Sequence, residues 1–194
     1  MLLNEPVTLA NEVVALEPLT ADHGEDLGTA AAGLDHAWYT SVPRPEAVPD
    51  EIAWRLGQHA SGGMNPWAVR RLDTGRAVGM TTFCNIDQEN RHVEIGHTWI
   101  GVDAQRTAVN TAAKLLLLGH AFERCDAIAV EFRTHWHNRQ SRTAIERLGA
   151  RQDGVLRNHR LGPDGTLRDT VVYSILPHEW PAVRMGLTER LARR

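Results

Sequence analysis

Two periods of apolar and polar residues occur along the chain, and each period predicts a different kind of element. Short apolar and β-branched stretches predict strands, because a strand turns successive side chains to opposite faces. Segments with apolar residues three or four positions apart predict helices. The predicted strands are residues 12–17, 67–72, 77–84, 92–100, 128–132, 155–161 and 167–176. The predicted helices are residues 20–32, 49–61, 107–123, 141–148 and 181–191.

The residue types between these segments support the boundaries. Thr20 is typical of a helix N-cap, and Pro49 and Pro181 suit the first turn of a helix. Gly149 is typical of the position just after a helix. Proline, aspartate and glycine favour turns and loops because they restrict the backbone or tolerate unusual torsion angles. The predicted turns and loops are residues 41–45, 73–75 and 163–165.

Strict alternation along residues 92–100 predicts which side chains share a face. One face would carry Val93, Ile95, His97 and Trp99. The opposite face would carry Glu94, Thr98 and Ile100, so these three side chains would lie close together.

The order of strands and helices predicts an α/β or α+β fold with helices on both faces of a sheet. The 194 residues suit a single domain, residues 1–194. The last helix has an apolar stripe, which must dock on the core or on a partner, so a homodimer is an expectation. The stripe consists of Trp180, Val183, Leu187 and Leu191.

Composition excludes several classes of protein. Apolar residues make up 42% of the chain and the net charge is −3, so a core can form and no basic field favours nucleic acid. No apolar run is long enough to span a membrane, and the N-terminus does not resemble a signal peptide. Cys84 and Cys125 lack the spacing of a metal site or a disulfide framework, which predicts no metal and a reducing cytoplasm. Lys114 is the single lysine beside twenty arginines.

The most informative segment is residues 105–110, which follow a predicted strand and enter the longest predicted helix. Consecutive N–H groups at a helix N-terminus can bind an anion such as a phosphate. An ordinary strand-to-helix loop explains the same residues equally well. The chain has no Walker A, Rossmann or nucleophile-elbow motif.

This segment resembles the phosphate-binding motif of the GNAT acyltransferases, and further motifs resemble their RimJ/RimL-like branch of ribosomal-protein N-terminal acetyltransferases. The resemblance runs from about Val13 to the last helix. It is carried by residues 93–96, 105–111, 121–123, 138–141, 144–145, 148–150 and 168–169. The family fold implied is a mixed, mostly antiparallel sheet of six to seven strands, splayed between the fourth and fifth.

The resemblance implies acetyl-CoA, or another acyl-CoA, as cosubstrate. Its pyrophosphate would lie on the loop and helix start, and its pantetheine arm on the splayed strand and an asparagine. The residues implied are Gln105, Arg106, Thr107, Ala108, Val109, Asn110, Thr111, Thr98, Trp99, Ile100 and Asn138. Helix capping is the alternative for Asn138. Ala108 and Asn110 replace the two glycines of the motif, and Ile145 replaces the tyrosine that serves many members as acid.

The catalytic roles implied fall on few residues. Glu94 lies eleven residues before Gln105, the spacing of the base in several members, with a solvated strand face as the alternative. Ser141 would donate to the leaving thiolate or only cap its helix. Asp169 would hold the substrate amine or form a surface ion pair.

The function implied is acetyl transfer from acetyl-CoA to a primary amine by direct attack. The acceptor is a protein N-terminus or a small molecule, and the partners are acyl-CoA and this amine. The replaced glycines and the missing tyrosine leave a second function open, a catalytically inactive sensor that binds acyl-CoA.

Overall fold

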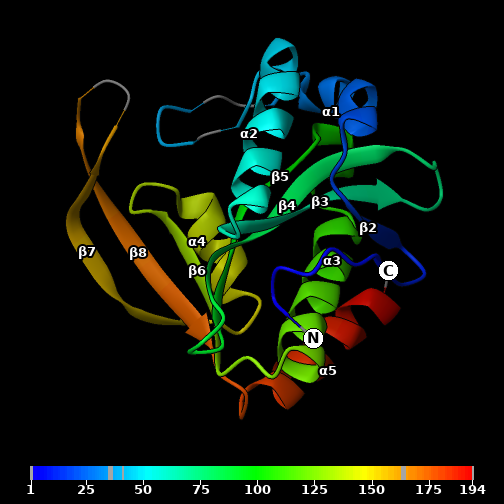
Figure 1. Cartoon of the computed structure of the whole chain (residues 1–194). Helices are drawn as coiled ribbons and strands as arrows, with labels where there is room; N and C mark the ends of the chain where they lie inside the picture. The colour runs from blue at the N-terminus through cyan, green and yellow to red at the C-terminus, as the bar shows by residue number, and fades with distance from the viewer. Residues whose placement is uncertain (1, 35–36, 41, 163–164, 194) are drawn as a thin grey trace.

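The structure is a computed structural model that describes residues 2–34, 37–40, 42–162 and 165–193. These residues form an eight-stranded sheet in the order β1-β2-β3-β4-β5-β6-β8-β7 (Figure 1). The strands are β1 Leu9–Ala10, β2 Val14–Pro18, β3 Met64–Arg71, β4 Ala77–Asp87, β5 His92–Ile100, β6 Ala129–His135, β7 Arg151–Leu161 and β8 Leu167–Ile175. The predicted fold class is confirmed, with one strand more than expected. The extra strand β1 has two residues, too few for a periodic pattern.

The helices follow the predicted order with shifted ends. They are α1 Gly24–Ala31, α2 Val48–Ala60, α3 Val109–Gly119, α4 Arg139–Glu146 and α5 Trp180–Ala192. The helix predicted over 107–123 is wrong at both ends, because α3 starts two residues later and residues His120–Arg124 form a π-helical turn. Residues 163–164 of one predicted turn and residue 41 of the predicted loop lie outside the described residues.

Separate apolar layers cover the two faces of the sheet. On one face α3 and α5 pack against side chains such as Phe83, Val93 and Ile95. On the other face α1 and α2 pack against Met80 and Trp99. Figure 1 shows α3 and α5 running side by side, away from α1 and α2. Each face of the sheet therefore has its own helices and its own apolar layer.

The C-terminal helix α5 buries its apolar stripe within the chain. Trp180, Val183 and Leu187 belong to the core that α3 also lines, and Leu191 packs against that core. The stripe therefore does not require a partner, and this reason for expecting a homodimer is removed. Among the described residues, no helix combines the length and apolar character needed to cross a membrane.

Strand β5 separates from β6 after its first three residues. The two strands pair in parallel over His92, Val93 and Glu94, and the rest of β5 pairs with β4 on its other side. The expected splay is thus present, and it leaves the backbone of residues 95–100 open toward β6. Backbone groups left unpaired in this way are available to a ligand.

A β-bulge in β5 overturns the predicted alternation of side chains. Thr82 of β4 pairs with Gly96 but Met80 pairs with Trp99, so β5 carries one extra residue here. His97 absorbs the bulge with a φ of 47°. An extra residue reverses the faces beyond it. Trp99 therefore packs on the α1–α2 side. The prediction that Glu94 shares a face with Thr98 and Ile100 is wrong.

Candidate active site

The opening between β5 and β6 lies beside the N-terminus of α3. The loop before α3 is fixed by its own side chains: Gln105 Nε2 donates to the Ile100 carbonyl at 2.9 Å, and Thr107 Oγ1 donates to the Ala104 carbonyl at 2.6 Å. Arg106 has a φ of 58° in the left-handed region, which turns the chain into the helix. A helix start held in this way presents N–H groups that suit a phosphate.

The predicted cofactor residues differ in how they face this helix start. Gln105 and Arg106 are exposed, whereas Thr107, Ala108, Asn110 and Thr111 are half-buried. Val109 is buried in the core, and its N–H donates to Thr107 Oγ1 at 3.3 Å. The side chain of Val109 is therefore not part of the loop surface. Small side chains at Thr107 and Ala108 leave the backbone approachable.

Glu94 is a buried carboxyl group, with 7% of the residue exposed. Asn85 Nδ2 donates to Glu94 Oε2 at 2.6 Å, and Arg133 Nε lies 3.6 Å from the same oxygen. Burial raises the pKa of Glu94, although the Asn85 hydrogen bond and the Arg133 charge act in the opposite direction. The alternative of a solvated strand face is wrong. A carboxyl group with a raised pKa suits a general base.

The bulge beside Glu94 is held from α2 by a buried arginine that sequence reasoning missed. Arg55 Nη2 donates to the carbonyl of His97 at 2.8 Å, and Nη1 donates to Thr82 Oγ1 at 2.7 Å. Its Nε pairs with Glu51 Oε1 at 2.8 Å. Gly96 is also required here, because a Cβ would lie 2.8 Å from Cys84 Sγ. The helical spacing in α2 indicated only an amphipathic helix.

Lys114 is a second buried group that sequence reasoning passed over. It lies on α3, and its Nζ donates to Thr98 Oγ1 at 3.0 Å, while the hydroxyls of Thr98 and Thr81 are 2.8 Å apart. Burial lowers the pKa of Lys114 to about 7. The only available signal was its being the single lysine of the chain.

Asn138 and Ser141 form the start of α4. The backbone N–H of Ser141 donates to Asn138 Oδ1 at 3.0 Å. Asn138 therefore caps the helix, which was the alternative role predicted for it. The Ser141 residue is half-buried. Contacts of either residue with the pantetheine arm or the thiolate stay predictions.

Asp169 is engaged within its own hairpin. Its Oδ1 accepts from the N–H of Asn158 at 2.8 Å, and Arg157 Nε lies 2.6 Å from its Oδ2. These partners lower the pKa of Asp169, the Asn158 hydrogen bond most of all. The geometry matches the surface ion pair rather than a free ligand for an amine.

Aromatic rings line the end of β6 next to the segment that follows α1. The ring of Trp38 lies 4.9 Å from that of His135 and 5.6 Å from that of His137. Trp38 is 56% exposed. The exposed rings of Trp38 and His137 therefore form an aromatic wall beside the buried ring of His135.

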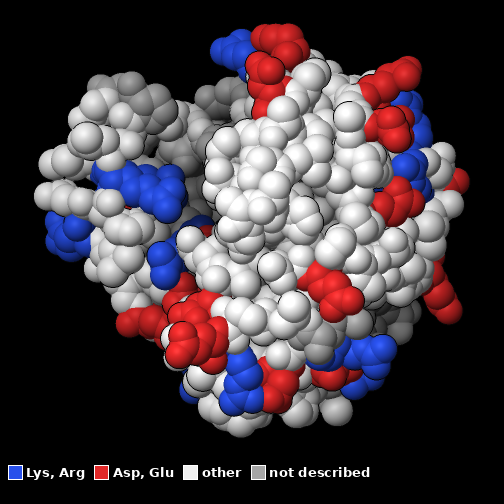
Figure 2. Space-filling model, in the orientation of Figure 1, with Lys and Arg blue, Asp and Glu red and all other residues white. Residues whose placement is uncertain are grey.

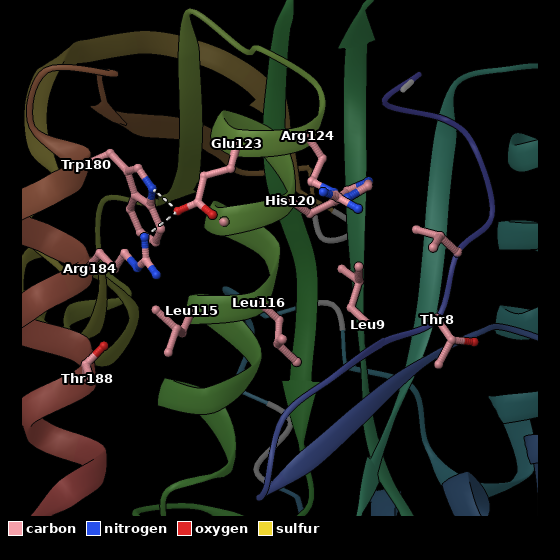
Figure 3. Close-up of a pocket in the computed structure, with 12 residues that line it drawn as sticks. Thr8, Leu9, Leu115, Leu116, His120, Glu123, Arg124, Trp180, Arg184 and Thr188 are labelled. Carbon is pink, nitrogen blue, oxygen red and sulfur yellow. Dashed lines mark hydrogen bonds and ion pairs between the residues drawn. The ribbon is translucent and has the colours of Figure 1, made fainter.

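A groove of about 410 Å³ lies elsewhere, between β1, the C-terminal half of α3 and α5. Glu123 lines it and points toward α5, accepting from Trp180 Nε1 at 2.8 Å and pairing with Arg184 at 3.2 Å (Figure 3). Its lining includes none of the predicted site residues. Among the described residues, no group of three or more His, Cys, Asp or Glu side chains is arranged to hold a metal.

Comparison with known proteins identifies the class of enzyme. Residues 14–151 match the acetyltransferase (GNAT) domain family. The chain is 34% identical over 182 residues to "Putative ribosomal N-acetyltransferase YdaF" of Bacillus subtilis (strain 168), covering 92% of this chain and 95% of that protein. The protein is therefore an acetyltransferase. More specifically, the chain belongs to the GNAT family.

Solved structures agree with this assignment. A GCN5-related N-acetyltransferase from Brucella melitensis superposes with a TM-score of 0.85 at 29% identity, over 96% of this chain and 86% of that chain. Mycobacterium smegmatis RimJ, solved in complex with CoA-disulfide, has the same fold, with a TM-score of 0.76 at 21% identity. That match covers 98% of this chain and 97% of RimJ.

Proposed function

We propose that the protein transfers the acetyl group of acetyl-CoA to a primary amine by direct attack. The observation that carries the proposal is Glu94, a buried carboxyl group whose pKa is raised where β5 leaves β6. A base is needed there because an amine must lose a proton as it attacks a thioester. The alternative of an inactive sensor gives no reason to bury this acid.

The chain's residues fit an acyl-CoA cosubstrate. The start of α3 offers N–H groups to the pyrophosphate, and the unpaired backbone of β5 offers hydrogen bonds to the pantetheine arm. CoA-disulfide in the complex of RimJ, which shares the fold, supports the same cosubstrate class. When bound, acetyl-CoA supplies an activated acetyl thioester.

Residues of the chain then supply the base, the hydrogen-bond donor for the thioester oxygen and the proton for the thiolate. Glu94 accepts a proton from the amine, directly or through water, while a backbone N–H of residues 98–100 hydrogen-bonds the thioester oxygen. The new C–N bond forms as the C–S bond breaks, and the thiolate leaves toward Ser141. Ile145 cannot donate a proton, so the thiolate takes its proton from Ser141 or from water.

The relatives indicate that the acceptor is an amine but do not identify the compound. The name of the Bacillus subtilis relative, a ribosomal N-acetyltransferase, favours a protein N-terminus. A small-molecule amine presents the same nucleophile.

The decisive experiment measures thiol release from acetyl-CoA with a panel of N-terminal peptides and small amines. Mass spectrometry of the product should find one acetyl group added to the amine. Tight acetyl-CoA binding, measured by calorimetry, without turnover of any amine would instead establish the sensor function.

A further inference from the structure

Two arginines face each other on the β7–β8 hairpin. Arg160 and Arg168 are direct cross-strand partners, and like charges in such positions destabilise a sheet. Within the part of the chain that the structure describes, Arg168 Nε is buried without a hydrogen-bond partner, and no carboxylate forms a salt bridge with either arginine. A pair kept at such a cost fits a site that an anion completes.

The pair lies on the same face of the sheet as Glu94. Glu94 pairs with Glu131, and alternation along β6 brings His135 to the same side as Glu131. His135 pairs with Thr170, and alternation along β8 brings Arg168 to the side of Thr170. A continuous row of side chains thus runs from the proposed base to the arginine pair.

Electrostatic coupling agrees with this placement. The charge of Glu94 acts on Arg168, although burial has the larger effect and lowers the pKa of Arg168. At His97, desolvation and then the charges of Arg55, Arg160 and Arg168 lower the pKa to about 4. Figure 2 shows a hollow between the β7–β8 hairpin and the rest of the molecule, with basic side chains on the hairpin side. The hairpin side of the hollow therefore carries positive charge in a chain of net charge −3.

We propose that the acceptor amine carries an anionic oxygen group, a carboxylate or a phosphate, which Arg160 and Arg168 bind while the amine lies at Glu94. The proposal rests on the acetyltransferase function proposed above. Guanidinium groups bind both anions through paired N–H donors. The proposed function assigns the phosphates of CoA to a different place, the start of α3.

The test compares acceptors that differ only in charge. One pair is an N-terminal peptide with Asp at its second position and the same peptide with Asn, and the other is phosphoethanolamine and ethanolamine. The enzymes are wild type, R160Q, R168Q and R151Q. Arg151 is a matched control, since it lies on the same strand β7 and pairs with Glu179.

The unaltered enzyme should prefer the charged member of at least one pair, and which pair responds distinguishes carboxylate from phosphate. R160Q and R168Q should lower kcat/KM for that acceptor by roughly 10–100-fold, the effect of a lost charged hydrogen bond. They should change kcat/KM for the neutral acceptor much less, because these arginines act on it only through the charge of Glu94. The KM for acetyl-CoA should stay the same, and R151Q should leave all substrates unaffected. Equal losses for charged and neutral acceptors, or a changed KM for acetyl-CoA only, would overturn the proposal.

A thermal measurement keeps the inference separate from the enzymatic function. If no amine is acetylated, the proposed function fails, but phosphoethanolamine and the Asp peptide still probe the arginine pair. At least one of them should raise the melting temperature of the wild type more than that of the R160Q/R168Q double variant. If each probe shifts the melting temperature equally in the wild type and in the double variant, the pair binds neither anion.

Discussion

Glu94 and Lys114 are buried ionisable groups on opposite sides of strand β5, and their surroundings differ in kind. Glu94 lies with Asn85 and Arg133, a donor and an opposite charge. Lys114 has a hydroxyl partner, Thr98, within the layer that α3 covers. Burial raises the pKa of the acid and lowers the pKa of the amine to about 7. Both shifts favour the neutral form, because desolvation penalises charge.

The two faces of β5 therefore correspond to two proposed roles, one for the acceptor and one for the cosubstrate. The Glu94 side opens toward the arginine pair and the aromatic wall, where an acceptor would lie. The Thr98 side meets α3, whose N-terminus would hold the cosubstrate. The bulge at His97 creates the division, since without it Glu94 and Thr98 would share a face. Changes on the α3 side should therefore alter cosubstrate binding or stability, and changes at Glu94 should alter the rate.

The largest effect is expected at the start of α3. Ala108→Trp should abolish measurable binding of acetyl-CoA, because the indole would cover the N–H groups at the helix start. Calorimetry measures the affinity, and circular dichroism checks the fold. Ala182→Trp is the matched control, an exposed alanine in the first turn of α5. Unchanged affinity in Ala108→Trp would remove this loop as the binding site.

On the other side of β5, Glu94→Gln should lower the acetyl-transfer rate by roughly 10²–10⁴-fold, the usual contribution of a positioned base. The amide retains an oxygen for the Asn85 hydrogen bond, so the fold and the acetyl-CoA affinity should persist. Raising the pH should partly rescue the variant, because more of the amine is then deprotonated. A wild-type rate across about pH 6 to 9 would leave Glu94 without a catalytic role.

Glu131→Gln is the control that sharpens this prediction. Glu131 is the register partner of Glu94, and its negative charge contributes to the raised pKa of Glu94. Its removal should lower the pKa of Glu94 and move the acidic limb of the pH–rate profile to lower pH. An acidic limb that does not move would mean that another group controls it.

Lys114 should affect stability with a distinct pH dependence. Its folded pKa of about 7 lies below the ordinary lysine value, so the unfolded chain binds more protons between these two values. The free energy of unfolding of the wild type, relative to Lys114→Met, should rise with pH by up to about 1.4 kcal/mol per unit in this window. The same difference in free energy of unfolding should decrease as the pH is lowered from the ordinary lysine pKa toward 7. Parallel stability profiles in denaturant titrations would contradict the neutral buried amine.

The smallest effect is expected at Ser141. Ser141→Ala should lower kcat by less than roughly tenfold, because water can protonate a thiolate whose pKa is about 8.5. The backbone N–H bonded to Asn138 is retained, so the α4 cap survives. Thr143→Ala, an exposed change on the same helix, is the control. A loss as large as that of Glu94→Gln would make Ser141 the required acid.

Local periodicity was sufficient for the order of the helices and seven of the strands, because each depends on neighbours within one segment. The position of the loop at Gln105 is also local, since a strand followed by small residues and an apolar helix is visible in the sequence. Only the family resemblance favours a phosphate site there over an ordinary loop. Glu94 is a candidate because its spacing from this loop matches that of the base in several members of the family that the chain resembles. The structure adds its burial and its raised pKa.

Tertiary structure decided everything that depends on pairing between distant segments. The bulge at His97 exists only relative to the register of β4, so alternation along residues 92–100 alone placed Trp99 and Thr98 on the wrong faces. Arg160 and Arg168 become a like-charged pair only when β7 and β8 align. The sequence by itself determined the elements and the candidate base, whereas long-range hydrogen bonding decided which side chains meet, because register is set by partners far apart in the chain.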